Sequence, residues 1–267
     1  MIEPPADEGS SGEQHARPLT PESIAVIMDG NGRWAESRGL PRARGHEEGA
    51  ETLRRLTRHC VARGVRELTC YALSTENFRR RPPPEVADLM RLLQLYLDRN
   101  REELLELGVR VRFIGHREEL PPEVRESMER VERESAAHDG LVLRLAINYG
   151  SRSELVEAAR ALARAVRSGE LAPEEIDEER LAAHLHDPTM ADPDLLIRTA
   201  GEERLSNFLL WQASYSELHF APCLWPDFTP ERLEEAIASY AARLRKYGAV
   251  RSSDPVPRPP VVDAEGR

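Results

Sequence analysis

Lysine is almost absent from this sequence of 267 residues, in which Lys246 is the one lysine among 37 basic residues. Arginine therefore serves even where lysine would do, so the position of an arginine, more than its type, must support any anion-binding role. Basic residues are also outnumbered by 47 acidic ones, which gives a formal net charge of −10. That balance argues against a large nucleic-acid interface, because such a surface needs a basic face or stripe.

Other scarcities narrow the class of protein further. The three cysteines, Cys60, Cys70 and Cys223, lack metal-ligand spacing, which indicates small buried hydrophobes in a reducing compartment. No apolar run approaches the roughly 18 residues that span a bilayer, and the N-terminus begins with acidic and proline residues instead of a secretion signal. We therefore expect a cytoplasmic protein. The GxxxxGK and GxGxxG patterns are missing, which disfavours a kinase or nucleotide hydrolase.

The two ends of the chain differ in composition from its middle. Residues 1–20 and 249–267 are rich in Pro, Gly and acidic residues, so we predict disordered tails around one folded domain, residues 21–248. Within that domain short β-rich runs alternate with segments of helical period. This pattern predicts a single α/β domain, a mostly parallel six-stranded sheet flanked by helices. The predicted strands are Ile24–Met28, Glu67–Ser74, Val109–Gly115, Leu141–Asn148, Asp194–Thr199 and Glu217–Phe220.

Two segments of helical period carry an apolar stripe at spacings of three and four residues. One runs from Val86 to Leu104 and the other from Leu233 to Leu244. From the pattern alone, such a stripe is more often core packing, and the alternative is the wall of an apolar tunnel.

Polar motifs follow four of the predicted strands. They are Asp29–Arg33, Ser74–Asn77, Asn148–Gly150 and Arg198–Thr199. In an open parallel sheet the carboxyl ends of the strands meet at one edge, where ligands bind. The motifs therefore predict one shared site.

The residue types at this edge favour phosphate chemistry. Gly30 and Gly32 let the backbone approach a ligand, and amides near a helix start accept oxyanions. Two clusters of basic side chains suggest two anions, and diphosphates are clamped by several donors and typically by Mg²⁺ with one or two carboxylates. Asp29 is placed to be such a carboxylate. The basic residues are Arg33, Arg42, His46, Arg79, Arg80, Arg81, Arg198 and Arg204.

Simpler interpretations exist for each of these residues taken singly. Asp29 could be a turn or cap residue, His46 could cap a helix, and Arg80 could lie on a solvated loop. Because these residues are expected at the same edge of the sheet, local structural roles alone do not explain all of them.

The ordered motifs carry a family resemblance that runs from about Ser23 to about Gly248. They read IAVIMDGNGRW from Ile24, RARGH from Arg42, STENFRR from Ser74, NYG from Asn148 and DLLIRTAGEERLSNFLLWQ from Asp194. This series closely resembles the cis-prenyltransferases, typified by undecaprenyl diphosphate synthase. The DDxxD pattern of trans-prenyltransferases is absent, which favours the cis class.

The resemblance implies a role for each matching residue. Asp29 would bind Mg²⁺ as an essential carboxylate, Glu217 would join the metal site, and Ser74 and Asn77 would orient the substrate and assist proton loss. The isopentenyl diphosphate would be held by Arg198, Arg204 and Ser206. The implied site for the allylic diphosphate comprises Gly30, Asn31, Gly32, Arg33, Trp34, Arg42, His46, Ser74, Phe78 and Arg80.

The resemblance also implies a reaction and an assembly. The enzyme would add isopentenyl diphosphate units to an allylic diphosphate such as farnesyl diphosphate, and the favoured product is undecaprenyl diphosphate, a lipid carrier for cell-wall synthesis. A short or medium product is the alternative, and a catalytically silent subunit is a rival of another class, although such subunits usually lose the Asp and Gly residues that are intact here. The family fold is an α/β homodimer with a hydrophobic substrate tunnel, and peripheral contact with the inner membrane surface is compatible with it.

Three positions depart from the family pattern. Phe78 stands where Trp is common, Ala200 replaces a usual Gly, and Glu203 occupies a position often held by His. We expect them to affect rate and metal affinity more than reaction type.

Overall fold

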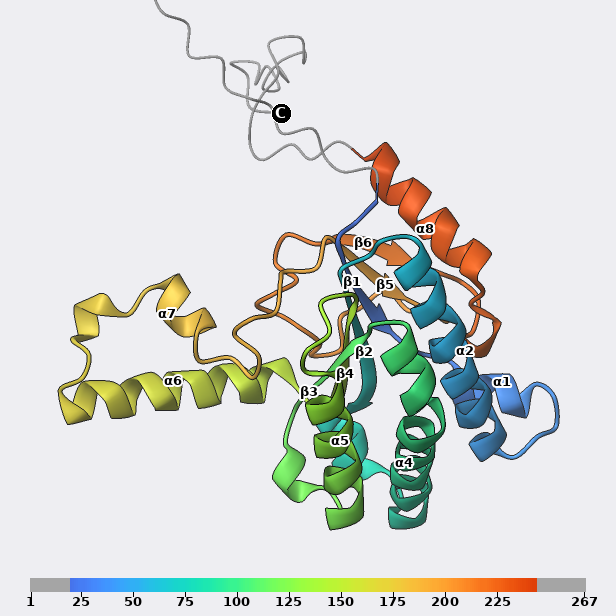
Figure 1. The fold of residues 1–267 in the computed structure, drawn as a ribbon, viewed down its shortest axis with the longest axis horizontal. Coiled ribbons are helices and arrows are strands. Elements are labelled where there is room, and N and C mark those ends of the chain that lie inside the picture. The colour runs from blue at the N-terminus through green and yellow to red at the C-terminus, as the bar shows by residue number, and fades with distance from the viewer. Residues whose placement is uncertain (1–19, 244–267) are drawn as a thin grey trace, which may run out of the picture.

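A six-stranded parallel sheet lies at the centre of the structure, a computed structural model that describes residues 20–243 (Figure 1). The strand order is β3-β4-β2-β1-β5-β6, and every neighbouring pair is parallel. The prediction of a single α/β domain is confirmed, and each strand begins and ends within one residue of its predicted bounds. The strands are β1 (Ser23–Ile27), β2 (Glu67–Ser74), β3 (Arg110–Ile114), β4 (Val142–Tyr149), β5 (Leu195–Arg198) and β6 (Glu217–Phe220).

Helices flank this sheet, and four of them, α2, α4, α5 and α8, cover the same face (Figure 1). The apolar stripe that begins at Val86 lies on α4, and the stripe that begins at Leu233 lies on α8, as the helical period predicts. The α-helices are α1 (Asn31–Glu36), α2 (Arg42–Ala62), α3 (Thr75–Arg80), α4 (Pro83–Glu106), α5 (Pro122–Ser135), α6 (Ser151–Ser168), α7 (Glu178–Ala182) and α8 (Pro230–Ala242), and the short 3-10 helices are η1 (Arg117–Glu119), η2 (Pro173–Glu175) and η3 (Trp225–Asp227).

Each face of the sheet has its own hydrophobic core, because successive side chains of a strand point to opposite faces. In β1, Ile24 and Val26 belong to the larger core beneath the four helices. Ala25 belongs to the smaller core on the other face, which the loop between β5 and β6 covers. There the ring of Tyr71 stacks on Phe208 with 4.4 Å between the centroids. This packing fixes the loop that follows β5 against the sheet.

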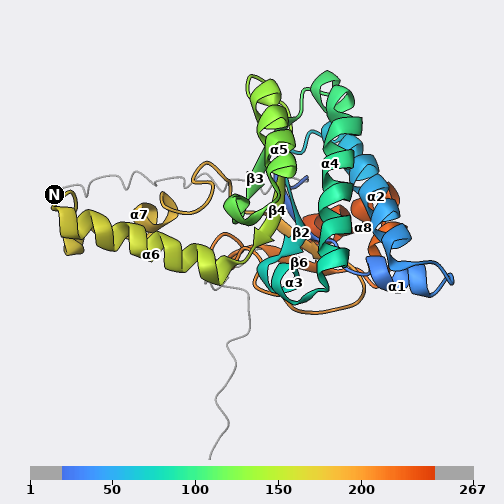
Figure 2. The ribbon, with the colours of Figure 1, turned by 90° about the horizontal axis from the view of Figure 1, so that it is seen from below.

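Helices α6 and α7 form an arm that extends away from the sheet (Figures 1 and 2). The buried residues of α6 lie in its first twelve positions, from Ser151 to Leu162. At the base of the arm the Tyr149 hydroxyl donates a 2.6 Å hydrogen bond to Glu154, whose side chain is fully buried. The periodicity of a helix identifies its apolar side but not the surface that this side contacts. The sequence pattern therefore does not predict the arm.

Several expectations concern the ends and the surface of the chain. The predicted tails, residues 1–20 and 249–267, lie outside the described residues apart from Thr20, and they stay predictions. Cys60 and Cys70 are buried as expected, whereas Cys223 is partly exposed. No helix between residues 20 and 243 combines the length and the hydropathy needed to cross a membrane.

Candidate active site

A cleft of about 610 Å³ opens at the carboxyl edge of the sheet. Asp29 reaches it from the turn after β1, Ser74 from the end of β2 and Arg198 from the end of β5. The motif Asn148–Gly150 does not line this cleft; Tyr149 is buried beside it, where its carbonyl accepts the hydroxyl of Tyr71 at 3.0 Å. The structure therefore brings together three of the four motifs that the parallel sheet was expected to collect.

Most of the predicted site residues line this cleft. They are Asp29, Gly30, Asn31, Gly32, Arg33, Arg42, His46, Ser74, Asn77, Arg198, Arg204 and Ser206. Five arginines and two carboxylates lie on its wall, an excess of three formal positive charges in a chain whose net charge is −10. The cleft is thus locally cationic, as an anion-binding site requires.

Asp29 is held in place by two arginines. Its Oδ2 accepts a 2.8 Å bond from Nη2 of Arg198, and its Oδ1 accepts a 3.2 Å bond from Nη2 of Arg33. The side chain of Arg198 is 4% exposed, while that of Asp29 is 28% exposed and faces the cleft. The backbone is fixed as well, since the amide of Asp29 donates to Thr199 Oγ1 at 2.9 Å. The carboxylate therefore has a defined position at the cleft surface.

Arg198 joins Asp29 to the loop that follows β5. Its Nη1 donates to the carbonyl of Arg204 at 2.5 Å and to Oγ of Ser206 at 2.7 Å. These are the three residues predicted to hold isopentenyl diphosphate, and the structure places them in one hydrogen-bonded group. The side chain of Arg204 itself is exposed and pairs with Glu202, which also lies 3.6 Å from Arg33.

Two glycines make the first loop possible. Gly30 has a φ of 110°, and a Cβ there would lie 2.9 Å from Leu224 Cδ2. A Cβ on Gly32 would lie 2.5 Å from Nη1 of Arg42. Glycine at these positions thus permits the turn after β1 and lets the guanidinium of Arg42 approach it.

His46 presents a neutral imidazole to the cleft. Its pKa is lowered to about 4, mainly by burial and also by the nearby charges of Arg81 and Arg42, against the opposing effect of Glu85. Its Nε2 is buried without a hydrogen-bond partner, and so is Nε of Arg198. Unpaired buried nitrogens are rare and call for an explanation, which a ligand bound in the cleft would supply.

Ser74 acts as the N-cap of α3. Its Oγ accepts a 3.1 Å hydrogen bond from the amide of Asn77, which is the side-chain cap that Ser provides at helix starts. This bond fixes the backbone at Asn77, whose side chain is exposed on the cleft wall.

Four predicted residues do not line the cleft. Trp34 donates from Nε1 to Asp227 at 2.7 Å, Phe78 packs against the larger core, and Arg80 is exposed on α3. Glu217 begins β6 at the amino edge of the sheet, where its Oε2 accepts a 3.0 Å bond from Arg243. Within one chain Glu217 and Asp29 therefore lie at opposite edges of the sheet, and its metal role stays a prediction.

Other cleft residues were not assigned roles from the sequence. Tyr71, Glu76, Arg81 and Asn207 line the wall, and Asn207 donates to Glu76 at 2.9 Å. Arg81 belongs to the basic cluster after the second strand. The sequence shows this cluster, but it does not show which of its side chains point into the cleft. Tyr71 lies inside a strand, where the sequence pattern indicates only core packing.

The departures from the family pattern are accommodated locally. Ala200 has a φ of 72°, the left-handed region that glycine adopts without strain, and its amide donates to Cys223 at 2.7 Å. Glu203 is exposed and outside the cleft lining, whereas its neighbour Glu202 pairs with the arginines.

An apolar space adjoins the cleft. A cavity of about 100 Å³ between α2, α4 and the sheet shares Met28, Asn31 and His46 with the cleft wall. It also shares Leu89 and Tyr96 with a groove of about 690 Å³ between α2 and α4. Side chains of the α4 stripe thus line an apolar cavity that adjoins the cationic cleft.

Residues 27–248 match a family model described as "Putative undecaprenyl diphosphate synthase". The chain belongs to this prenyltransferase family. The resemblance noted in the sequence is thereby confirmed, and the protein is a prenyl transferase enzyme. An isoprenyl transferase of Geobacillus kaustophilus is 48% identical over 89% of this chain and 92% of its own. One from Brucella suis is 50% identical over 86% of this chain and 90% of its own.

Solved structures support the same family. A lavandulyl diphosphate synthase from Lavandula x intermedia, in complex with dimethylallyl diphosphate, matches this prenyltransferase with a TM-score of 0.84 and 39% identity over 86% of this chain and 99% of its own. A probable undecaprenyl diphosphate synthase from Campylobacter jejuni matches with a TM-score of 0.71 and 34% identity over 86% of this chain and 99% of its own.

Proposed function

We propose that this enzyme condenses isopentenyl diphosphate with an allylic diphosphate such as farnesyl diphosphate, and that it makes undecaprenyl diphosphate. The observation that carries the proposal is the cationic cleft around Asp29 and Arg198, which adjoins an apolar cavity. A molecule with a diphosphate head and a hydrocarbon tail matches both parts. The solved relative that contains dimethylallyl diphosphate supports the allylic part of the proposal.

The cleft residues would act through charge and position. Negative charge builds on the leaving diphosphate as its bond to the allylic carbon breaks, and Arg33 and Arg42 would stabilise that charge. Arg198, Arg204 and Ser206 would hold the second diphosphate so that the isopentenyl double bond faces the same carbon. Loss of a proton from the newly joined isopentenyl unit to an oxygen of the released diphosphate, assisted by Ser74 and Asn77, would then form the new allylic double bond.

The donor set at Asp29 fits Mg²⁺. This ion takes one or two carboxylates and completes its shell with water and substrate phosphates, and Asp29 presents a partly exposed carboxylate on the cleft wall. When bound, Mg²⁺ would neutralise charge on the leaving diphosphate. The additional ligand role of Glu217 is part of this proposal and needs its own test, since Glu217 lies at the other edge of the sheet.

The growing chain would occupy the cavity between α2 and α4. Leu89, Leu93 and Tyr96 on α4 line this space. Each CH₂ moved from water into such a lining is worth about 0.8 kcal/mol, so a lengthening product is held more tightly at every step. Release of the product would then limit turnover. A tunnel long enough for the undecaprenyl chain is part of the proposal.

The proposed assembly is a homodimer. The arm of α6 and α7 extends from the body, and Val156 on α6 is 48% exposed. Size-exclusion chromatography with light scattering tests this, and we expect Val156→Glu to shift the dimer toward monomer. The cytoplasmic location and the peripheral contact with the inner membrane surface stay predictions.

Incubation of the purified chain with farnesyl diphosphate, labelled isopentenyl diphosphate and Mg²⁺, followed by sizing of the extracted lipid, tests the reaction. A ladder that ends near C55 would support the undecaprenyl product. A shorter end point would keep the reaction and change the product. No incorporation at any Mg²⁺ concentration would favour the silent-subunit alternative.

A further inference from the structure

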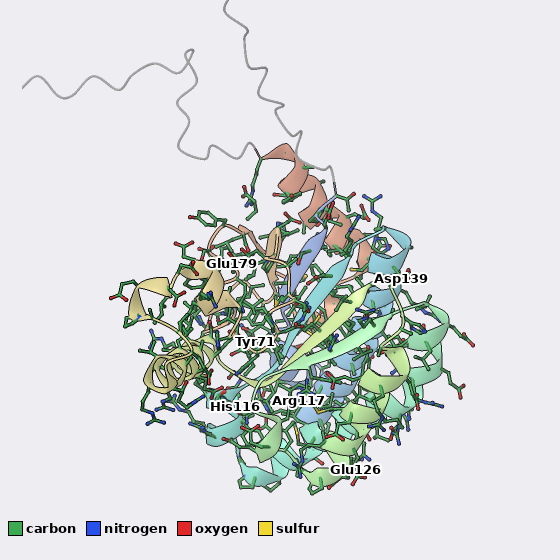
Figure 3. All side chains as sticks on the ribbon, turned by 60° about the vertical axis from the view of Figure 1, so that its left-hand side comes forward. Tyr71, His116, Arg117, Glu126, Asp139 and Glu179 are labelled. Carbon is green, nitrogen blue, oxygen red and sulfur yellow. The ribbon has the colours of Figure 1, made fainter. Side chains whose placement is uncertain are left out.

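A second group of ligand side chains lies outside the cleft, at the base of the arm. His116 follows β3, Glu157 lies on α6, and His186 lies in the segment after α7. Figure 3 shows His116 at the end of its strand, beside α6. Among residues 20–243, this is the one group of three or more His, Cys, Asp and Glu side chains whose ligand atoms lie within 4.8 Å of one another.

The spacing of these atoms is close to that around a tetrahedral metal ion. Nδ1 of His116 lies 3.4 Å from Oε1 of Glu157, and Nε2 of His186 lies 3.0 Å from Oε2 of the same carboxylate. Bonds of about 2.0–2.1 Å to Zn²⁺ place neighbouring ligand atoms about 3.3 Å apart. The two imidazoles contact different oxygens of the carboxylate, and one ligand atom from each of the three residues lies within 4.8 Å of the others, so small side-chain rotations would bring them around one ion.

Hydrogen bonding orients the ring of His116. The Ser153 hydroxyl donates its one proton to the carbonyl of Gly150 at 2.7 Å, so toward Nε2 of His116, at 3.3 Å, it can only accept. Nε2 is thus directed at Ser153, and Nδ1 is the nitrogen left for a ligand. It faces two carboxylates, Glu157 and Glu118, the latter at 3.5 Å. A metal ion between these groups would join all three.

The surroundings of the second histidine are also those of a metal ligand. Nδ1 of His186 is buried without a hydrogen-bond partner and lies 3.9 Å from Oε1 of Glu154, which is fully buried. Histidines that bind metals usually direct their second nitrogen to a carboxylate or another acceptor. Ser153 serves His116 in this way, and Glu154 is placed to serve His186.

We propose that His116, Glu157 and His186 bind a divalent transition metal ion of the Zn²⁺ class. Glu118, whose side chain is exposed and lies 3.5 Å from His116, would turn toward the ion as the fourth ligand. Imidazole with carboxylate suits Zn²⁺ better than Mg²⁺, which prefers oxygen ligands alone. The ion is structural, because it joins the end of β3, helix α6 and the segment after α7. This site is separate from the cleft, and it does not depend on the reaction proposed above.

Cobalt binding to the full chain tests the proposal. The protein is prepared without a histidine tag, stripped of metal with a chelator and titrated with Co²⁺ in excess Mg²⁺, which occupies oxygen-rich sites. We expect saturation at one equivalent, with the intense visible absorption of tetrahedral Co²⁺ that Zn²⁺ then displaces. His116→Asn and His186→Asn should each weaken binding at least about tenfold, and Ser153→Ala should weaken it about 10- to 100-fold.

His184→Asn is the matched control. His184 lies in the same segment but is exposed, and its Nδ1 contacts only the carbonyl of Arg180 at 2.8 Å. Its variant should bind Co²⁺ as the unaltered chain does. Circular dichroism verifies that each variant is folded. The proposal is overturned if the unaltered chain gives no tetrahedral Co²⁺ spectrum, or if folded His116→Asn and His186→Asn bind the ion with unchanged affinity.

Discussion

The guanidinium of Arg198 connects the two halves of the cleft through Asp29. Its Nη2 lies 2.8 Å from Oδ2 of Asp29, and its Nη1 donates to Ser206 on the loop after β5. Since Arg198 is almost fully buried, it cannot turn away into solvent. The two proposed diphosphate sites therefore share one fixed cation, and the position of Asp29 is set before any ligand binds.

Asp29→Asn should greatly reduce turnover while the chain still folds. The amide keeps an oxygen that accepts from Arg198, so we expect a loss of about 1–3 kcal/mol in the free energy of unfolding. Removal of the negative charge should lower kcat about 100-fold or more, because the proposed Mg²⁺ loses its carboxylate. Steady-state kinetics at several Mg²⁺ concentrations measure this, and near-normal turnover would contradict the metal role.

Arg204→Ala should act mainly on the second substrate. The side chain of Arg204 is 59% exposed and pairs with Glu202, so little packing is lost. We expect the KM for isopentenyl diphosphate to rise about tenfold, the value of one charge-assisted hydrogen bond of about 1.5 kcal/mol. Arg232→Ala is the control, since Arg232 is similarly exposed and pairs with Glu235 on α8. If both variants have the same KM for isopentenyl diphosphate, the site for the diphosphate of this substrate lies away from Arg204.

Ser74→Ala should separate a capping role from a catalytic one. Ser74 caps α3, and Asp177 caps α7 by accepting from the amide of Arg180 at 2.8 Å. Loss of either cap should cost about 1 kcal/mol in the free energy of unfolding. Only Ser74→Ala should lose prenyltransferase activity, by about tenfold or more. If Asp177→Ala loses as much activity, the effect reports stability alone.

The sequence predicted the sheet well, because parallel buried strands produce short β-rich runs with clear limits. It also predicted which loops share the carboxyl edge, since that follows from the direction of the strands. Ser74 shows where this reasoning ends: its position at the edge was predictable, but its bond to the amide of Asn77 depends on the backbone of α3.

The sequence did not predict the directions of side chains or the contacts between distant segments. Arg80 and Arg81 are neighbours in one basic run, and only the structure shows that Arg81 lines the cleft. The group of His116, Glu157 and His186 comes from three segments with no recognisable spacing. Such a cluster depends on how the arm meets the sheet, which no local pattern encodes.

His46 should make the protein less stable in acid. Its pKa is about 4 in the folded chain and about 6.5 when unfolded, so between these values the unfolded chain binds more protons. The free energy of unfolding should therefore fall as the pH drops from about 6.5 to about 4, by up to about 1.4 kcal/mol per pH unit from this residue. The free energy of unfolding, measured with urea at each pH in this range, should change less steeply with pH for His46→Gln than for the unaltered chain. The variant of the exposed His184, His184→Gln, should keep the original slope.

Leu93→Ala should lengthen the product. Leu93 lines the cavity between α2 and α4, so its truncation enlarges the space proposed for the hydrocarbon chain. Leu97, one turn further along α4, is fully buried in the core and is not part of the cavity lining. Leu97→Ala should cost about 2–5 kcal/mol in the free energy of unfolding and leave the product unchanged. Chromatographic sizing of the lipids compares the two variants, and the same product distribution in both would place the growing chain elsewhere.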